Sequence, residues 1–460
     1  MKVKLPDTLI LLSVILILFC GLTWVLPAGA FDRDLVDGRE IVVPGSFHWT
    51  AANPSSVFDL ILAPIQGFID SAQVIVFIFF VAGAFGIINA TGAIANGLKS
   101  VVKTDANGKN PVWVIPVLTF LFSLAGATFG MSEEVLVFIM ITLPMAYGLG
   151  YDSFLGVGIP FLGAGAGFAG AFLNPFTVGI AQGIAGLTPF SGWEYRVVVW
   201  LLFTVGTALF LMRYAKRLNA NPASSPNYQE DLSSPYRESD KENSIEFTLR
   251  QKLIVGLFLG GLCLLIVGVN VWGWYINEIS GLFLVLGIVS ALLARLQLQK
   301  TLDAFVSGAS EMVKVCLVIA MAKGIIIIAS EGRIIDSMLY GASVAVDGFP
   351  KAVSIQLMFY VQTCLNFFLP SGSGQAALTM PIMAPLSDII GISRQSAVLA
   401  FQLGDGLSNM IIPTSGITMG VLTLANISYQ KWLKWIWPLM VIYFLLAMTL
   451  LIPPVLYFNW

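Results

Sequence analysis

Apolar runs of about 20 residues recur along the chain and are separated by short polar segments. A helix of about that length crosses the hydrocarbon core of a bilayer. The first run covers residues 9–30 and is followed by a polar segment at residues 31–56. An amphipathic stretch at residues 57–70 then precedes a second run at residues 71–98. The pattern predicts an all-α polytopic membrane protein.

Two pairs of shorter apolar segments predict re-entrant hairpins, in which the chain enters the membrane and leaves on the same side. The first hairpin covers residues 111–150 and is interrupted by a Gly-rich tip at residues 126–134. The second covers residues 350–392, with a Ser/Gly tip at residues 369–375. Each hairpin therefore presents its polar tip inside the membrane.

A helix interrupted by polar residues and proline is predicted after each hairpin. Residues 153–187 are interrupted at residues 174–177, and residues 394–426 are interrupted at residues 409–414. The remaining predicted spans are residues 196–214, 253–272, 279–296, 313–335 and 435–457, with an amphipathic stretch at residues 301–311. The scheme contains about nine transmembrane helices and two hairpins.

The halves of the chain share the same order of features. Residues 1–215 form the predicted first repeat, residues 216–250 a cytoplasmic linker that we expect to be flexible, and residues 251–460 the second repeat. Residues 91–96 match residues 331–336, and each half then shows a hairpin and a broken helix. Matched spans run in opposite directions, which predicts an inverted repeat with its transport site at the paired interruptions.

The distribution of positive charge sets the predicted orientation. Of the 24 lysines and arginines, 16 fall in predicted internal segments and six in predicted external ones. This bias predicts that the N-terminus lies on the cytoplasmic side of a bacterial inner membrane. Lys2 and Lys4 precede the first apolar run, and residues 28–30 resemble a signal-peptidase site. We expect the run to be retained as a span, because the repeat requires it.

Composition agrees with a membrane protein and excludes several other classes. Hydrophobic residues make up 57% of the chain and charged residues 11%, against about a quarter in soluble proteins. A net charge of −2 without a basic patch argues against nucleic acid as a partner. One histidine and four scattered cysteines offer neither a catalytic triad nor a zinc site. We therefore expect no enzyme, no metal centre and no cofactor.

The interruptions of the broken helices are candidate binding sites. A break leaves backbone N–H and C=O groups without partners, which is tolerated where they are buried in protein or line a cavity. Asn174 and Thr177 mark the first break, and Asn409, Thr414 and Ser415 mark the second. All but Ser415 are candidate substrate ligands, and Asn174, Asn409 and Ser415 are candidate ligands of a coupling ion. The alternative is a proline kink whose polar side chains only satisfy the backbone.

The second hairpin tip suits a carboxylate. Ser371, Gly372, Ser373 and Gly374 open a predicted helix, and the exposed N–H groups at a helix N-terminus attract negative charge. The alternative is an ordinary Gly/Ser turn.

The first hairpin tip differs because it is acidic. Ser132, Glu133 and Glu134 follow its glycines, and carboxylates at membrane depth are usually functional. The alternative is helix capping by Ser132 with acids in the first turn. If the two unlike tips meet, they suit a substrate that carries both an ammonium group and a carboxylate.

Asp405 lies within an apolar segment, one helical turn before Asn409. An acid in this position is a candidate ligand for Na⁺ or a proton. The alternative is a structural ion pair with Lys323, the basic residue deepest in a predicted span.

The chain resembles the anaerobic C4-dicarboxylate carrier-like (DcuC/YfcC) family, and more narrowly its branch of basic amino-acid antiporters. The resemblance rests on residues 126–134, 172–179, 369–375 and 404–416. It implies membership of the ion-transporter superfamily, with a scaffold domain that forms a homodimer. It also implies a transport domain, built from the hairpins and broken helices, that moves as an elevator.

The expected function is a secondary active transporter for a small carboxylate-bearing metabolite, in particular an amino acid of the basic class. Transport would be driven by coupling to Na⁺ or H⁺, or by exchange of substrates. A C4-dicarboxylate carrier is the first alternative, and a non-transporting receptor or an intramembrane enzyme belongs to other classes.

Overall fold

The computed structural model describes residues 8–36, 39–43, 45–94, 96, 112–188, 190–234, 247–272, 274, 276–310, 312–346, 349–458 and 460. The segment between the second predicted span and the first predicted hairpin, which contains Lys99, Lys103 and Lys109, lies outside these ranges, as do residues 235–246 of the predicted linker.

The polar segment after the first helix contains short strands. Helix α1 covers Thr8–Val25, and two antiparallel strand pairs follow it. Strand β1 (Gly29–Ala30) pairs with β4 (His48–Trp49), and β2 (Arg33–Val36) pairs with β3 (Arg39–Val42). The all-α prediction is wrong for this segment, where Val and Ile favour extended backbone in both strands of the second pair.

The remaining elements of the first half follow the predicted order. They are α2 (Val57–Asp70), α3 (Ala72–Ala90), α5 (Val114–Phe129), α6 (Val135–Gly148), α7 (Ser153–Ala169), the π-helix η1 (Pro175–Gly179), α8 (Ile180–Ile184) and α9 (Trp193–Ala220). Helix α2 has the predicted bounds, and Ser56 and Asp59 form a capping box that determines its start.

The predicted linker contains the 3₁₀ turn η2 (Pro222–Ser224) and α10 (Tyr228–Leu232). The second half follows with α12 (Leu249–Trp272), α13 (Ile276–Ala294), α14 (Leu298–Ser310), α15 (Val313–Glu331), α16 (Ile334–Val346), α17 (Lys351–Phe368), α18 (Gly372–Ile390), α19 (Arg394–Ser408), α20 (Gly416–Leu424) and α21 (Tyr429–Leu456). The span predicted at residues 313–335 is wrong at its end. Arg333 has a φ of 54°, so the helix stops there and α16 starts separately.

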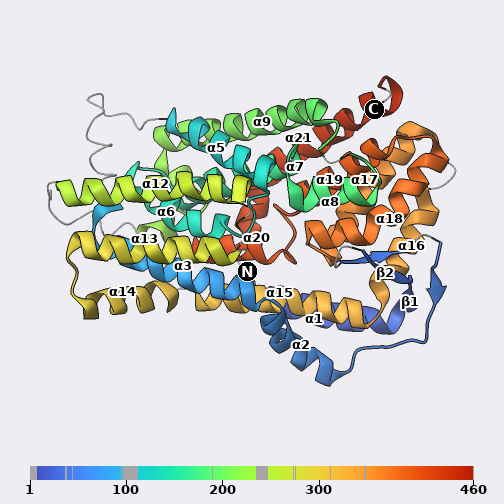
Figure 1. The fold of residues 1–460 in the computed structure, drawn as a ribbon, viewed down its shortest axis with the longest axis horizontal. Coiled ribbons are helices and arrows are strands. Elements are labelled where there is room, and N and C mark those ends of the chain that lie inside the picture. Colours follow the sequence, from blue (N-terminus) through green and yellow to red (C-terminus); the bar gives the residue numbers. More distant parts are fainter. Residues whose placement is uncertain are drawn as a thin grey trace.

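The helices pack in two groups (Figure 1). The first group contains α1, α2, α3, α12, α13, α14 and α15, and its contacts cross between the halves, with α2 on α15 and α14 on α3. Glycines permit this crossing: a Cβ atom on Gly86 would lie 3.1 Å from the Cα atom of Gly308. The two groups meet where α15 packs on α20 and α3 packs on α6.

The second group contains α5 to α9 and α17 to α21, and its contacts also repeat between the halves. Helix α7 packs on α5, α6 and α9, and α19 packs on α17, α18 and α21. The short second limbs of the broken helices cross over, so that α8 packs on α18 and α20 packs on α6. Each limb thus contacts a hairpin arm of the other half.

Five helical segments in the described part of the chain are long and apolar enough to cross a membrane. They are Ala72–Ala90, Trp193–Ala220, Ile276–Ala294, Leu298–Glu331 and Tyr429–Leu456. Large apolar side chains such as Leu209 and Ile442 face outward on them, as a lipid environment requires. The protein is an integral membrane protein, and the total of about nine transmembrane helices remains a prediction.

The prediction of a flexible linker is wrong for its first half. Elements η2 and α10 lie there, and the side chains of Asn227 and Asp231 are only 1% and 3% exposed. The composition of the segment suggested disorder, but its polar side chains are buried in hydrogen bonds with distant helices.

Candidate functional site

The tip of the first hairpin rests on the first break. Gly130 has a φ of 72°, and a Cβ atom on it would lie 2.6 Å from Oδ1 of Asn174. Asn174 is fully buried, and its Oδ1 accepts a hydrogen bond from the N–H of Phe176 at 2.9 Å. The N–H groups of Phe172 and Leu173 donate to the carbonyl oxygen of Ala127. These contacts satisfy part of the backbone that the break exposes.

The tip of the second hairpin meets the first break as well. Helix α18 begins at Gly372, and Oγ of Ser371 caps it by accepting from the N–H of Gly374 at 3.3 Å. A Cβ atom on Gly372 would lie 2.5 Å from Cγ2 of Thr177 and 3.0 Å from Oδ2 of Asp405. Because Gly372 has no side chain, the second hairpin tip contacts both Thr177 of the first break and Asp405 of α19.

Asp405 is fully buried and belongs to a network of amides. Its Oδ1 accepts from Nδ2 of Asn409 at 3.0 Å, and Oδ1 of Asn409 accepts from Nδ2 of Asn366 at 3.0 Å. The same Nδ2 of Asn366 also reaches the carbonyl oxygen of Asp405 at 3.0 Å. Within the described residues, Oδ2 of Asp405 has no donor. The alternative of an ion pair with Lys323 is wrong, because among the described residues no basic side chain lies within 4.0 Å of either carboxylate oxygen of Asp405.

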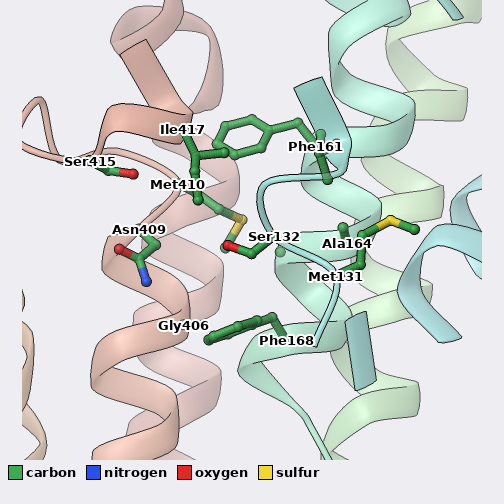
Figure 2. A pocket seen from close by; sticks show the side chains of 12 residues that line it. Met131, Ser132, Phe161, Ala164, Phe168, Gly406, Asn409, Met410, Ser415 and Ile417 are labelled. Atoms are coloured by element: carbon green, nitrogen blue, oxygen red, sulfur yellow. The ribbon is translucent and has the colours of Figure 1, made fainter. Parts of the chain in front are cut away.

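A small cavity separates the two halves beside this network (Figure 2). One wall comes from α7 and the first tip, and the other from α19 and the start of α20. The cavity is lined by Met131, Ser132, Val135, Phe161, Ala164, Gly165, Phe168, Gly406, Asn409, Met410, Ser415 and Ile417. Its volume of about 40 Å³ holds a few water molecules, so a metabolite would need the walls to separate.

The two acids of the first tip lie beside this cavity rather than in its lining. Glu134 is 8% exposed, and its Oε2 accepts from the N–H of Ser132 at 3.0 Å. Its carboxylate thus bonds the loop that precedes it, and no described side chain caps the start of α6 at Glu134, so capping by Ser132 is not what the structure shows. Glu133 is half-buried next to it.

Buried oxygens of the breaks remain available for a ligand. The Oγ1 atoms of Thr177 and Thr414 are buried and have no hydrogen-bond partner among the described residues. Thr177 and Asp405 both border Gly372, and carboxylate and hydroxyl oxygens are ligands that hard cations accept. Ser415 is occupied differently, because its Oγ caps α20 by accepting from the N–H of Thr418 at 3.3 Å.

A larger cavity of about 920 Å³ reaches the second tip from the side of the short strands. Gly29, Asp336 and Gly374 lie in its lining, and Arg33 forms an ion pair with Asp336 at 2.8 Å across it. Ser373 is exposed and lines neither cavity, whereas its neighbour Gly374 lines the larger one.

Sequence reasoning missed several buried amides near the site. Asn366 donates hydrogen bonds to Asp405 and Asn409. Gln375 donates to Oε1 of Gln362 at 2.7 Å. Gln402 donates to the carbonyl oxygen of Phe168 at 2.5 Å. The available signal was the presence of polar amides inside apolar runs, where they are costly and usually have a partner.

The chain is similar to known proteins in sequence and in fold. The model of the family described as "C4-dicarboxylate anaerobic carrier" matches residues 5–455. The chain is 35% identical to "Putative basic amino acid antiporter YfcC" of Escherichia coli, over 93% of this chain and 92% of that protein. It is 31% identical to an uncharacterized protein of Haemophilus influenzae, over 97% and 96% of the two chains. The Alcanivorax borkumensis YdaH transporter structure aligns with a TM-score of 0.43 and 17% identity, over 97% of this chain and 98% of that one.

The helical fold and these relatives define an integral membrane protein of the transporter class. The chain belongs to the anaerobic C4-dicarboxylate carrier family.

Proposed function

We propose that the protein is a secondary active carrier that moves an amino acid, of the basic class, through the site between the two broken helices. The observation that carries the proposal is the meeting of Gly372, Thr177 and Asp405, which brings the second tip and both broken helices to one point. Paired interrupted elements of this kind form ligand sites in carriers. The name of the Escherichia coli relative supports the choice of substrate.

The proposed movement is that of an elevator. The second group of helices carries the site and would slide past the first group, which would form a homodimer in the inner membrane with the N-terminus in the cytoplasm. The limited contact surface, mainly α15 on α20, supports such sliding. Asp405 would carry the coupling ion, Na⁺ or a proton, because one of its oxygens is buried without a donor in the described residues.

A C4-dicarboxylate carrier is the second candidate, and the family description favours it. The lining of the small cavity contains no charged residue, so a dicarboxylate would depend on N–H groups at the starts of α18 and α20. A basic amino acid would instead use Glu133 beside the cavity.

Uptake into proteoliposomes tests the proposal. Radiolabelled L-arginine and fumarate would be offered under a Na⁺ gradient and a pH gradient, each imposed separately. We expect accumulation of L-arginine, with counterflow when unlabelled L-arginine is loaded inside. Binding of L-arginine without movement into sealed vesicles would indicate a receptor, and uptake of fumarate alone would favour the second candidate.

Asn409→Ala should reduce uptake by more than about tenfold, because the variant leaves Asp405 and Asn366 without their buried partner. Asn277→Ala is a matched control, since Asn277 is exposed on α13. Near-normal uptake by Asn409→Ala would place the site elsewhere.

A further inference from the structure

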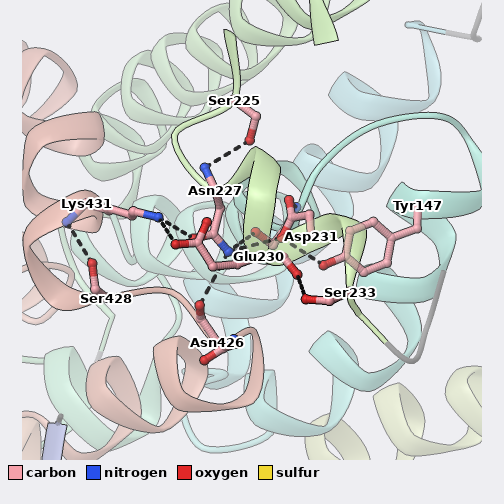
Figure 3. Close-up of polar contacts among 10 residues, drawn as sticks. Tyr147, Ser225, Asn227, Glu230, Asp231, Ser233, Asn426, Ser428 and Lys431 are labelled. Carbon is pink, nitrogen blue, oxygen red and sulfur yellow. Dashed lines mark hydrogen bonds and ion pairs between the residues drawn. The ribbon is translucent and has the colours of Figure 1, made fainter. Parts of the chain in front are cut away.

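The first half of the linker between the repeats is packed against the second group of helices (Figure 3). Residues 222–234 contain η2 and α10, and their polar side chains meet the turn before α7 and the turn between α20 and α21. Nothing in the proposed transport site uses these contacts.

Asp231 is the centre of this contact. Its Oδ1 accepts from the hydroxyl of Tyr147 at 3.1 Å and from Nδ2 of Asn227 at 3.0 Å. Its Oδ2 accepts from the N–H of Ser153 at 3.0 Å, at the first residue of α7. The partial positive charge of a helix N-terminus stabilises a carboxylate there. The linker is thereby attached to the start of the first broken helix.

The neighbouring turn adds a second carboxylate to the same helix end. Asp152 accepts from the N–H of Leu155 at 3.0 Å and from Oγ of Ser225 at 2.7 Å, and the hydroxyl of Tyr214 also donates to it. Ser225 belongs to the linker, so the segment is held at two points.

Asn227 extends the contact to the other half of the protein. Its Nδ2 donates to Oγ of Ser153 at 3.2 Å and to the carbonyl oxygen of Asn426 at 3.3 Å. Its Oδ1 accepts from Nζ of Lys431, at the start of α21, at 3.0 Å. Lys431 also pairs with Glu230 at 2.6 Å. One buried amide therefore joins α7 of the first half to the α20–α21 turn of the second.

The joined elements are the two walls of the small cavity. Phe161 lies eight residues beyond Ser153 on α7, and Ile417 lies nine residues before Asn426 on α20. At about 1.5 Å per helical residue, the linker contacts both walls about 12 Å from the cavity.

We propose that residues 222–234 form a clamp that holds α7 and α20 together at their ends away from the small cavity and stays docked throughout the transport cycle, so that the walls separate only beside the cavity. Asp231 and Asn227 are its positioning residues. The proposal rests on the proposed function in assuming that this cavity receives the substrate. Every contact described above joins the clamp to the second group, so the clamp would travel with the moving body rather than open as a gate.

A disulfide lock tests whether the clamp stays docked. Ser153→Cys and Asn227→Cys would be combined after replacement of Cys20, Cys263, Cys316 and Cys364 by serine, and bond formation verified by mass spectrometry. Oxidised protein should take up L-arginine within about twofold of the reduced protein. A loss of more than about tenfold that dithiothreitol restores would show that the linker must release, and would overturn the proposal.

Asp231→Ala tests the positioning role. Removal of the carboxylate takes this acceptor from the hydroxyl of Tyr147 and the N–H of Ser153, and leaves Nδ2 of Asn227 with two of its three acceptors. KM for L-arginine should therefore rise about tenfold while kcat falls less than about threefold. A purely structural role would lower the yield of folded protein and leave KM unchanged. Gln229→Ala is the matched control on the same helix, because Gln229 is exposed, and it should change KM less than about twofold.

Binding separates failure of the clamp from failure of the proposed function. L-Arginine should raise the melting temperature of the wild type in detergent, and it should do so less in Asp231→Ala. An equal shift in both proteins would overturn the clamp even if transport is confirmed. Fumarate replaces L-arginine as the probe in every experiment on the clamp if the wild type moves only fumarate.

Discussion

Gly372 at the start of α18 packs directly against Asp405 of α19, with room for hydrogen but not for a methyl group. A Cβ atom at Gly372 would lie 3.0 Å from Oδ2 of Asp405 and 2.5 Å from Cγ2 of Thr177. The second hairpin tip, the first break and the buried acid therefore share one point of contact.

Gly372→Ala should abolish most of the uptake. The added methyl group must displace Thr177 or Asp405, both buried in a packed region, so the tip would move away from the break. Initial rates of L-arginine uptake should fall by more than about tenfold. Gly281→Ala is the control, because a Cβ atom there meets nothing within 4 Å. Equal rates in the two variants would mean that the tip need not pack closely.

Asp405→Asn should uncouple the carrier from its driving ion. The amide retains an oxygen that can accept from Asn409 but cannot bind a proton or supply a charge for Na⁺. Exchange of internal for external L-arginine should continue, while gradient-driven accumulation should fall to the equilibrium level. Accumulation at the wild-type level under either gradient would remove Asp405 from ion coupling.

The two acids of the first tip should behave differently. Glu133→Gln should raise KM for L-arginine about tenfold if the carboxylate meets the cationic group, with little change for a neutral amino acid. Glu134→Gln should lower thermal stability, since Glu134 accepts the N–H of its own loop. Comparison of L-arginine with L-leucine uptake and of melting temperatures measures both effects. Unchanged selectivity in Glu133→Gln would favour the dicarboxylate alternative.

Stability should depend on pH through Asp152, which lies in the turn between α6 and α7, outside the membrane-spanning segments. Burial raises the pKa of Asp152 to about 6, although hydrogen bonds from Tyr214, Ser225 and Leu155 oppose the rise. The unfolded carboxyl titrates at about 3.9, so the folded protein binds more protons between about pH 4 and 6. Stability should therefore fall as the pH rises through this window.

Asp152→Asn should flatten this part of the melting profile, because an amide does not titrate. Glu230→Gln serves as the contrasting variant: its hydrogen bond with Lys431 lowers the pKa of Glu230, so the stability it contributes is lost as the pH falls. Melting temperatures from pH 4.5 to 7.5 check both. An identical slope in Asp152→Asn and the wild type would contradict the assignment.

The local features of the fold could be read from the sequence. The start of α2 follows from the capping pair Ser56 and Asp59, and the Asn-Pro pair at residues 174–175 falls after the end of α7, where η1 begins. Such boundaries depend on backbone hydrogen bonds, apolar runs and caps, which involve residues a few positions apart. The candidate residues Asn174, Thr177, Asp405 and Asn409 were found because polar groups are costly in apolar segments.

Only the tertiary structure decided which of these residues meet. No local rule places Gly372 against Thr177 or buries Asn227 between α7 and the α20–α21 turn. The linker is the clearest case, since its polar composition is that of a disordered segment. Its order comes from donors and acceptors on distant helices, which compensate for the cost of burying Asn227 and Asp231 once the fold has formed.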